Sequence, residues 1–354
     1  MNTSILCESP LRRIRRQIRD RFWDGLTRRL DADVIEEVIK DSKVVSRSGI
    51  PTIYVPHAAQ AQLDYYSKVA ERLQGLKLQV VELPCQITAE VYRSMLASPG
   101  LLALDTHTQL DKNGNIETVA VPFVVPGGRF NEFFGWDSYF MGIGLLVDGR
   151  TDLVQGILRN WVFEINHYGI IPNANRSYLL MRSQPPFLTD LAIRFYQATK
   201  HQHPHEAQAF LRVCIKAAIK EYSEVWTKTP RLDPTSGLSK YHADGFGIPT
   251  EVEPGHFDTV LMPFALKYSI SIDEFTERFN NGEIDEPELE EYLQHDRGVR
   301  ESGHDTSSRL EGRASNLLIT DLNFCLYKYE TDIAWALRSV FDDNLDELPS
   351  LSLE

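Results

Sequence analysis

The chain has 354 residues, of which 42% are hydrophobic, and it carries a formal net charge of −13. This acidic balance argues against general binding to nucleic acids or to anionic membranes, and a neutral ligand fits better. Hydrophobic residues are spread without a clear break in composition, so one large domain is the simpler prediction.

The cysteines and the apolar runs bear on the compartment. Cys7, Cys85, Cys214 and Cys325 have neither metal-site nor redox spacing, so we interpret them as buried or incidental thiols in a reducing compartment. The first residues lack the sustained apolar run of a signal peptide, and no later run approaches membrane-spanning length. We therefore expect a cytoplasmic protein without a metal centre.

An arginine-rich segment opens the chain. Through it, apolar residues recur at helical spacing, namely Leu11, Ile14, Ile18, Phe22 and Leu26. The pattern favours an amphipathic helix packed on the main body with a solvated arginine face. A nucleic-acid or targeting patch is the alternative.

Short strands and one helix are expected next. The strand-like runs are 52–56, 78–83, 101–104 and 119–125, and the helix covers 62–76. Between the last two runs, the segment 111–115 contains the Asp-x-Asn-Gly pattern of a calcium loop. With Gly114 at the sixth position, Gln109 would be first and Ala120 twelfth, so the end ligands are lost. An Asn-Gly hairpin turn explains this segment better.

Beyond Trp136 the pattern becomes helical. Apolar residues at three- and four-residue spacing predict helices over 138–147, 153–168, 187–198, 205–226 and 317–340. Pro287 suits the first turn of another helix, and the acidic run around it indicates a solvated face. Helix pairs joined by polar loops indicate an all-α toroid or solenoid, and the lack of a fixed-period repeat disfavours the short-repeat solenoids.

The stretch from Pro126 to Asp137 is rich in site chemistry. Gly127 and Gly128 let the backbone turn where a side chain would clash, so Arg129 can be aimed into a cavity. Trp136 beside Asp137 pairs a flat apolar face with a two-oxygen acceptor, a combination that suits a polyhydroxylated ring. The alternative is a glycine turn followed by a helix with a core tryptophan.

Three later polar clusters are candidates for the other walls of the same pocket. They cover 172–186, 249–253 and 296–305. A loop rich in hydrogen-bonding groups can also be an exposed connection, and that reading stays open for the first of them.

These clusters carry a family resemblance. The segments 126–132 and 135–137 look like the first signature of the trehalases, glycoside hydrolase family 37. The segments 173–186 and 300–305 resemble the next two signatures in the same order. The fungal neutral, cytosolic trehalases are the most similar, through 164–168, 183–186 and 257–260. The similarity extends from about Leu11 to about Ile333.

The resemblance implies an (α/α)6 toroid over 121–354, incomplete at its C-terminal end, with a short α/β extension over 1–120 packed on it. It implies hydrolysis of α,α-trehalose to two glucose molecules with inversion and without a cofactor. Asp305 matches the general acid of the family. The sugar-binding positions match Arg129, Trp136, Asp137, Asn173, Arg182, Ser183, Gln184, Glu251, Arg300 and Gly303.

The proposed acid must be protonated near neutral pH, because the bond cleaves when its oxygen is protonated while water attacks the opposite face. Burial of Asp305 would favour the protonated form, and a close Arg300 would oppose it, so the sequence leaves the outcome open. Asp305 could instead cap a helix that begins at Thr306.

The second carboxylate of an inverting enzyme is missing from the pattern. In the family this base is a glutamate well downstream of the acid, after a Gln-Trp-Asp-x-Pro signature, and the sequence contains neither. Glu251 matches a sugar-binding position, and Glu301 is too close in sequence to Asp305. We therefore expect a fragment with little or no activity, lacking also the regulatory N-terminal tail through which calcium can act in full-length members.

Two other functions stay open for such a fragment. It could bind trehalose without catalysis, or it could pair with a full-length trehalase. The helix faces that an incomplete toroid exposes predict poor solubility or self-association.

Overall fold

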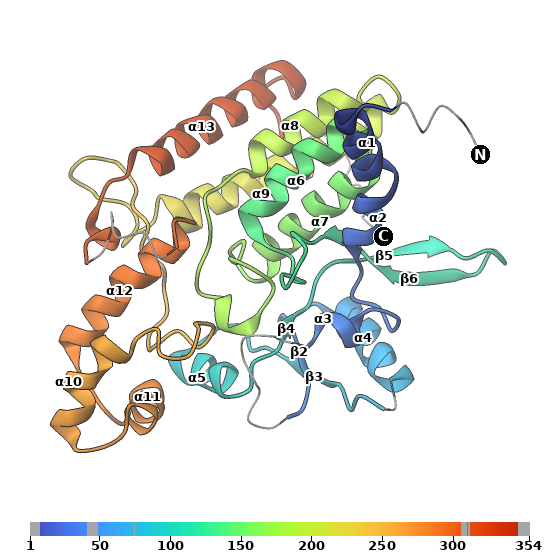
Figure 1. The fold of residues 1–354 in the computed structure, drawn as a ribbon. Helices are drawn as coiled ribbons and strands as arrows, with labels where there is room; N and C mark the ends of the chain where they lie inside the picture. Colours follow the sequence, from blue (N-terminus) through green and yellow to red (C-terminus); the bar gives the residue numbers. More distant parts are fainter. Residues whose placement is uncertain (1–7, 41–48, 74, 306–309, 311, 346–354) are drawn as a thin grey trace.

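The computed structural model describes residues 8–40, 49–73, 75–305, 310 and 312–345 (Figure 1). The helices, in chain order, are α1 (Pro10–Gln17), α2 (Trp23–Leu26), α3 (Ile35–Val38), α4 (Gln60–Arg72), α5 (Ala89–Ala97), α6 (Gly135–Val147), α7 (Thr151–His167), α8 (Leu188–Thr199), α9 (Pro204–Glu221), α10 (Asp258–Tyr268), α11 (Ile272–Asn280), α12 (Pro287–Glu301) and α13 (Thr320–Val340). The strands are β1 (Thr27–Arg28), β2 (Thr52–Val55), β3 (Gln79–Glu82), β4 (Leu101–Leu102), β5 (Thr106–Leu110), β6 (Ile116–Ala120) and β7 (Phe123–Val124).

The main core lies between the packed helices α6, α7, α8, α9 and α13. The helix α7 is at the centre, and its buried side chains include Ile157, Trp161 and Ile165. Helical periodicity predicted four of these helices to within a few residues and the start of α13 to within three, because one face of each is buried. The structure is therefore mostly helical beyond residue 135, and every named strand precedes α6.

A small parallel sheet of order β3-β2-β4 forms the N-terminal part, with α4 and α5 as the connections between its strands. All residues of the central strand β2 are buried. The predicted strands are confirmed here, although β4 is shorter than its apolar run. β1 pairs with β7 across the predicted boundary at residue 120, so the N-terminal elements and the helical part share one core.

The expected hairpin is confirmed. β5 and β6 pair in antiparallel fashion, with Leu110 opposite Ile116. Gly114 adopts a φ of 81°, and its N–H donates to the carbonyl oxygen of Asp111. A positive φ is what an Asn-Gly turn supplies at low cost. The run predicted over 119–125 is divided between two sheets, because β6 belongs to the hairpin and β7 pairs with β1.

The prediction that the arginine-rich helix packs through its apolar face is wrong for most of its length. Leu11 is 77% exposed, and Ile14 and Phe22 are each 51% exposed. Contact with the core begins at Trp23, whose Nε1 donates to Asp148 at 2.7 Å and whose ring lies against Gly144. Helical spacing thus predicted the helix correctly, but it could not show that most of its apolar face lacks a covering surface among the described residues.

A second, smaller core holds α10, α11 and α12 together at one end of the molecule. It is built around Phe257, Phe275, Phe279 and Leu293. Neither α10 nor α11 was predicted. α10 contains Pro263 and exposes Leu266 while it buries Leu261, so its sequence carries no clear apolar stripe. Pro287 does occupy the first turn of α12, as predicted.

The segment after α13 packs on the main core at its first residue. Phe341 is buried against the main core, and the Arg212 guanidinium lies 4.3 Å from its ring centroid. Arg212 also donates to the carbonyl oxygen of Asn344. These contacts fix the end of α13 on α9.

Two general features concern the described residues alone. None of their helices is both long and apolar enough to cross a bilayer. Cys85, Cys214 and Cys325 are free thiols, and Cys7 lies outside the described residues. The helix predicted to begin at Thr306 also lies outside them.

Candidate functional site

A cavity of about 560 Å³ opens where four loop regions meet. These are the connections before α6, between α7 and α8, before α10, and after α12. The cavity is lined by all the predicted site residues except Ser183, that is by Arg129, Trp136, Asp137, Asn173, Arg182, Gln184, Glu251, Arg300, Gly303 and Asp305. The prediction that these loops form walls of one pocket is therefore confirmed.

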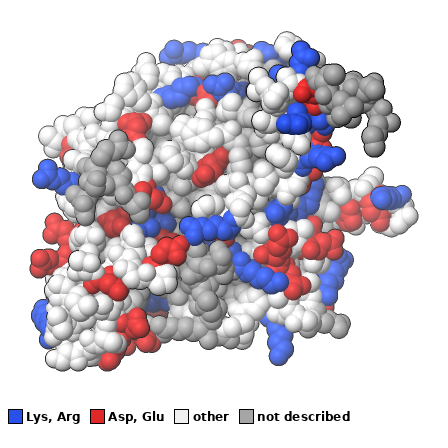
Figure 2. All heavy atoms as spheres, in the orientation of Figure 1, with Lys and Arg blue, Asp and Glu red and all other residues white. Residues whose placement is uncertain are grey.

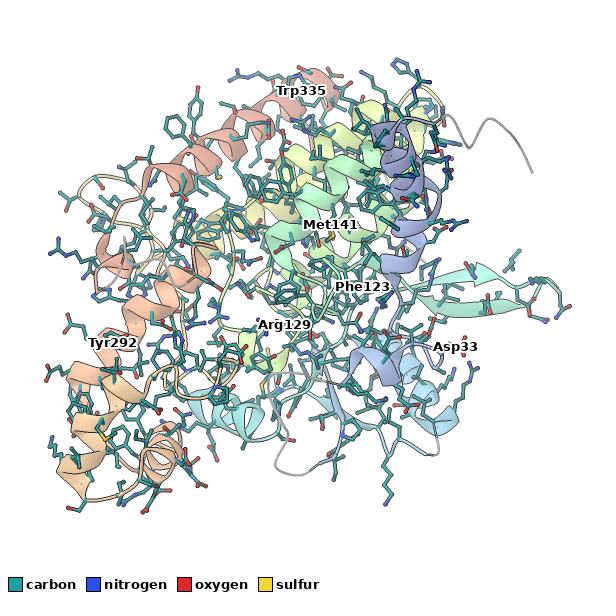
Figure 3. All side chains as sticks on the ribbon, viewed as in Figure 1. Asp33, Phe123, Arg129, Met141, Tyr292 and Trp335 are labelled. Atoms are coloured by element: carbon teal, nitrogen blue, oxygen red, sulfur yellow. The ribbon has the colours of Figure 1, made fainter. Side chains whose placement is uncertain are left out.

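The glycine turn before α6 has the expected geometry. Gly127 and Gly128 adopt φ values of 95° and 64°, and the Phe130 N–H donates to the carbonyl oxygen of Gly127. The turn presents Arg129 at the rim, where its Nη1 lies 2.9 Å from Glu253 Oε1. In Figure 3, Arg129 is drawn in the central region, between the labelled Phe123 and Tyr292. Both partners are more than half exposed, so a ligand can compete for this guanidinium at little cost.

Trp136 forms the aromatic surface of the pocket, and two contacts fix it. Its backbone N–H, in the first turn of α6, donates to Gln184 Oε1 at 2.8 Å. Gly303 adopts a φ of 75°, and a Cβ there would lie 2.5 Å from Cζ2 of the indole. Only glycine permits this close approach. The bare backbone after α12 thus lies directly against the tryptophan ring.

Arg182 and Glu251 form a buried ion pair in the wall. Their closest atoms are 2.8 Å apart, and the side chains are about one-tenth exposed. Burial by itself would raise the pKa of Glu251, but Arg182 and Arg300 outweigh it, so the pKa is lowered. The pocket therefore holds an ionised acceptor beside two cations.

Arg300 is held by contacts with Asp296 and His256. Its Nε donates to Asp296 at 2.7 Å, one helical turn earlier on α12. Its Nη2 lies 3.4 Å from His256 Nε2. The guanidinium is therefore oriented by α12 itself.

Asp305 is the last described residue of the segment after α12 that lines the cavity. The direction in which its pKa is shifted bears on its protonation. Desolvation of its carboxyl in the cavity raises the pKa of Asp305 above the ordinary value, although Arg182 and Arg300 act to lower it. Burial also raises the pKa of Asp137, and the nearby Asp305 raises it further. Asp305 lies at the mouth of the cavity, where the residue remains exposed to solvent.

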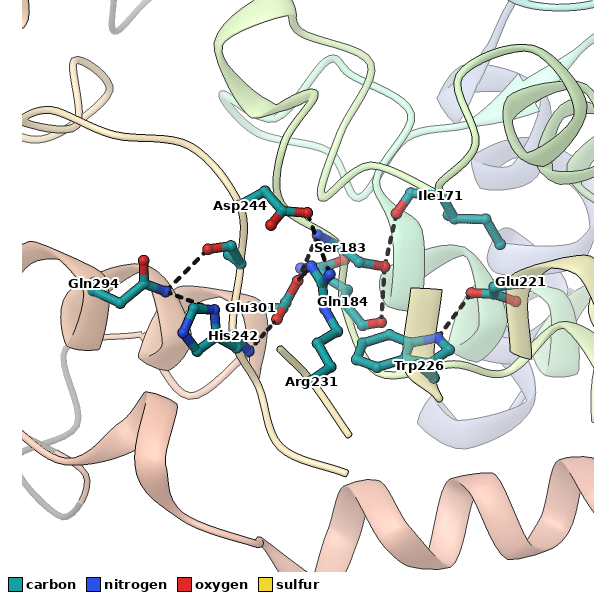
Figure 4. A network of polar contacts seen from close by, with 11 residues as sticks. Ile171, Ser183, Gln184, Glu221, Trp226, Arg231, His242, Asp244, Gln294 and Glu301 are labelled. Atoms are coloured by element: carbon teal, nitrogen blue, oxygen red, sulfur yellow. Dashed lines mark hydrogen bonds and ion pairs between the residues drawn. The ribbon is translucent and has the colours of Figure 1, made fainter. Parts of the chain in front are cut away.

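Ser183 lies behind the wall. Its hydroxyl donates to the carbonyl oxygen of Ile171 at 2.9 Å, and its N–H donates to Glu301 Oε1 at 3.1 Å. Figure 4 shows the network around Glu301, which also receives Arg231 Nη2 at 2.7 Å and the His242 N–H at 2.9 Å. The Arg182–Gln184 segment is thus tied to α12 and to the strand-like segment around His242.

Sequence reasoning missed several lining residues, namely Phe130, Glu132, Phe134, Arg176, Tyr178 and His304. Glu132 and Arg176 form a buried ion pair at 2.7 Å, and Arg176 also donates to the carbonyl oxygens of Val38 and Ile39. Both residues stood inside segments already singled out. Because the two residues are 44 positions apart, no local pattern in the sequence indicated that they form a pair.

The loop that carries Arg176 is held between two other segments. Asn175 accepts from the Phe133 N–H at 2.8 Å through Oδ1, and its carbonyl oxygen accepts from Leu102 N–H at 2.9 Å. The strand β4 is therefore hydrogen-bonded to the loop that forms part of the cavity wall, and it connects this loop to the small sheet.

A buried carboxyl lies beneath the pocket. A small void is lined by Glu221, Trp161, Gln184 and Trp136, and the indole N–H of Trp161 has no partner among the described residues. The Glu221 side chain accepts from the Tyr329 hydroxyl at 2.7 Å, and burial raises its pKa to about 7. Glu221 is therefore largely protonated in the folded protein below that pH.

This pKa predicts a pH-dependent stability. A raised folded-state pKa means that stability from Glu221 is full below the unfolded pKa, near 4.5, and is lost as pH rises through about 7. The loss is about 3 kcal/mol over this window. In Glu221→Gln this part of the pH dependence should disappear when unfolding by urea is measured from pH 4.5 to 7.5. An unchanged slope would contradict the assignment.

The arrangement suits a neutral, hydroxyl-rich ligand. Trp136 offers a flat apolar face, while the guanidinium groups and carboxylates around it can donate to and accept from hydroxyls. Figure 2 shows basic and acidic side chains side by side on this face of the molecule. Within the described ranges, no three metal-ligating side chains lie together.

Comparison with known proteins extends this picture. The sequence matches the family model described as trehalase over residues 3–350. It is 52% identical over 342 residues to the cytosolic neutral trehalase of Neurospora crassa, covering 96% of this chain and 46% of that protein. It is 47% identical to the cytosolic neutral trehalase of Saccharomyces cerevisiae, with the same coverage.

A solved structure agrees. The neutral trehalase Nth1 from Saccharomyces cerevisiae superposes with a TM-score of 0.90 at 47% identity, covering 95% of this chain and 61% of that one. The chain spans about half the length of the curated relatives it matches. On this likeness in sequence and in fold, the chain belongs to the trehalase family.

Proposed function

We propose that the cavity binds α,α-trehalose and that Asp305 is the general acid of an inverting trehalase. One observation carries this proposal: Asp305, with its raised pKa, lies in the same cavity as the ionised Arg182–Glu251 pair and the Trp136 ring. The cavity of about 560 Å³ is within the range of small-molecule sites, and a disaccharide would fill much of it.

The chemistry follows from these groups. Asp305 gives its proton to the oxygen that joins the two glucose units, and the bond between this oxygen and the anomeric carbon breaks with its electron pair going to the oxygen. Water attacks the anomeric carbon from the opposite face and loses a proton to a base. Arg182 and Arg300, which favour the ionised form of Asp305, stabilise the carboxylate left behind.

We infer that none of the described carboxylates of this pocket is the base. Of the lining carboxylates, Glu132 and Glu251 are each paired with an arginine, and Asp137 is close enough to Asp305 for the Asp305 carboxylate to raise the pKa of Asp137. An inverting pair needs room for water, with roughly 6.5–9.5 Å between the carboxyl groups. We infer that the base belongs to further helices of an (α/α)6 toroid, in the part of the relatives that this chain does not cover.

Two proteins test this proposal. The chain alone should release little or no glucose from trehalose. A chimera that joins it to the uncovered remainder of the Neurospora crassa enzyme should release glucose at a rate typical of a trehalase. The same rate from the chain alone would contradict the missing base, and an inactive but folded chimera would contradict the proposed function.

Binding without turnover is the second candidate, and the lining of Trp136, the Arg182–Glu251 pair and Arg300 would also serve a protein that only binds the sugar. Calorimetry with trehalose separates the two. Saturable binding by the chain together with an inactive chimera would favour a binding protein. A trehalase-pairing module would instead copurify with a full-length trehalase and bind no sugar alone.

Self-association is expected through exposed apolar side chains. Phe140 and Val147 on α6, and Phe324 and Tyr327 on α13, are between 56% and 68% exposed. Light scattering should therefore give a mass above 40.4 kDa for the chain alone, and Phe324→Ser/Tyr327→Ser should lower it. A monodisperse monomer at high concentration would refute this. By analogy with its relatives' names, we assign the protein to the cytosol.

A further inference from the structure

A second cavity, of about 510 Å³, shares no lining residue with the first. It lies between α4, the segment around Asp31, and the strands of the β5–β6 hairpin, which projects beside α4 in Figure 1. Asp33, labelled in Figure 3, marks the nearby turn into α3. Nothing in the proposed trehalose chemistry uses this cavity.

Three cationic side chains line this cavity. Lys68 and Arg72 lie four residues apart on α4, so they project from the same face of the helix. Arg29 reaches the cavity from the other side, and its Nη1 is fixed by the carbonyl oxygen of Ala120 at 2.8 Å. Within the described ranges, none of the three forms an ion pair. Such a group stands out on a chain with a net charge of −13.

The two carboxylates of the cavity are already engaged with neutral donors. Asp31 accepts from the N–H groups of Asp33 and Val34, each at 3.1 Å, and so holds the turn before α3. Glu117 accepts from Gln109 Nε2 at 2.7 Å across the hairpin. Neither carboxylate therefore neutralises the three cations through direct contact.

Neutral hydrogen-bonding groups complete the lining. Gln109 and Thr118 contribute side chains from the hairpin, and Tyr65 contributes its ring and hydroxyl from α4. Burial raises the pKa of Tyr65 to about 12, so its hydroxyl stays protonated and able to donate. The lining thus combines cations for an anionic group with groups that can bind hydroxyls.

We propose that this second cavity binds a small phosphate monoester, with Arg29, Lys68 and Arg72 around the phosphate. A phosphate monoester carries close to two negative charges at neutral pH and offers three strong acceptor oxygens, which match three cations that line one cavity. The volume leaves room for a sugar-sized organic part beside Tyr65 and Thr118. The site is separate from the trehalose cavity, so it can be tested without any hydrolytic activity.

The test is calorimetry on the chain with inorganic phosphate, glucose 6-phosphate and glucose. We expect saturable binding of the ester, weaker binding of phosphate, and none of glucose at this site. Lys68→Ala/Arg72→Ala should weaken the ester by at least about tenfold, since two charge-assisted contacts are lost. Lys112→Ala/Lys228→Ala, which removes two exposed lysines elsewhere, should leave the affinity within about twofold.

Two results would overturn the proposal. One is the absence of saturable binding at millimolar ester and low salt. The other is an equal loss of affinity in both double variants, which would mean that the anion responds to net charge alone. Equal free energies of unfolding for the two double variants and the parent would exclude misfolding as the cause of a loss. Equal affinity for phosphate and for the ester would show that the cavity recognises the phosphate group alone. This result would contradict the proposed contacts with a sugar-sized organic part.

Discussion

Replacing Glu301 by alanine should lower the free energy of unfolding by about 3–5 kcal/mol, the largest effect on stability that we expect. Glu301 is fully buried, and its carboxylate accepts from Arg231, from the Ser183 N–H and from the His242 N–H. Arg231 is itself 5% exposed at its side chain. Removing the carboxylate therefore leaves the buried Ser183 N–H and the partly buried His242 N–H without their acceptor, and it leaves the buried guanidinium with only the longer contact to Asp244 at 3.4 Å.

Urea unfolding at neutral pH measures this effect. Glu253→Ala is the matched control, because Glu253 also forms an ion pair with an arginine but is 73% exposed, and its loss should cost at most about 1 kcal/mol. Glu301→Gln should fall between the two, since the amide keeps one acceptor oxygen. Similar losses for Glu301→Ala and Glu253→Ala would show that the buried network does not hold the Arg182–Gln184 segment.

Glu301 also illustrates what the sequence could not supply. We set it aside as a candidate base because it is too close to Asp305 along the chain, and it does not line the cavity. Glu301 is kept out of the cavity by its position on α12. Adjacent residues of a helix point about 100° apart, so Arg300 faces the cavity while Glu301 faces the interior. Which of two neighbouring polar residues is inside depends on what packs around the helix.

Periodicity and resemblance predicted different parts of the structure. Regular apolar spacing was sufficient for α7 and α9, whose buried stripes are continuous. The grouping of the site loops came from the family signatures, because no local pattern brings Arg182 to Glu251 across 69 positions. The exposed Leu11 and the unpredicted α10 mark the limit: spacing reports which residues share a face, and the tertiary contacts decide whether that face is covered.

In the active chimera, Asp305→Asn should lower kcat by about 10²–10⁴-fold, the contribution expected of a general acid. The amide keeps the size of the side chain but cannot give a proton to the leaving oxygen. Trehalose binding should change little, because the Arg182–Glu251 pair and Trp136 are untouched. Asp285→Asn, an exposed carboxylate in the acidic run, is the matched control and should keep the parent rate. Near-parent turnover by Asp305→Asn would remove it from the mechanism.

The pH profile distinguishes proton donation from a structural role. Asp305 acts in its protonated form, so kcat should fall as pH rises through its pKa, which lies above the ordinary value. Arg182 lowers that pKa, so Arg182→Ala should move the alkaline limb of kcat to higher pH, although trehalose binds less tightly. In Asp305→Asn the residual rate should lose this limb. A limb that stays in Asp305→Asn would mean that another group gives the proton, and Asp137, whose pKa is also raised, would be the next residue to replace.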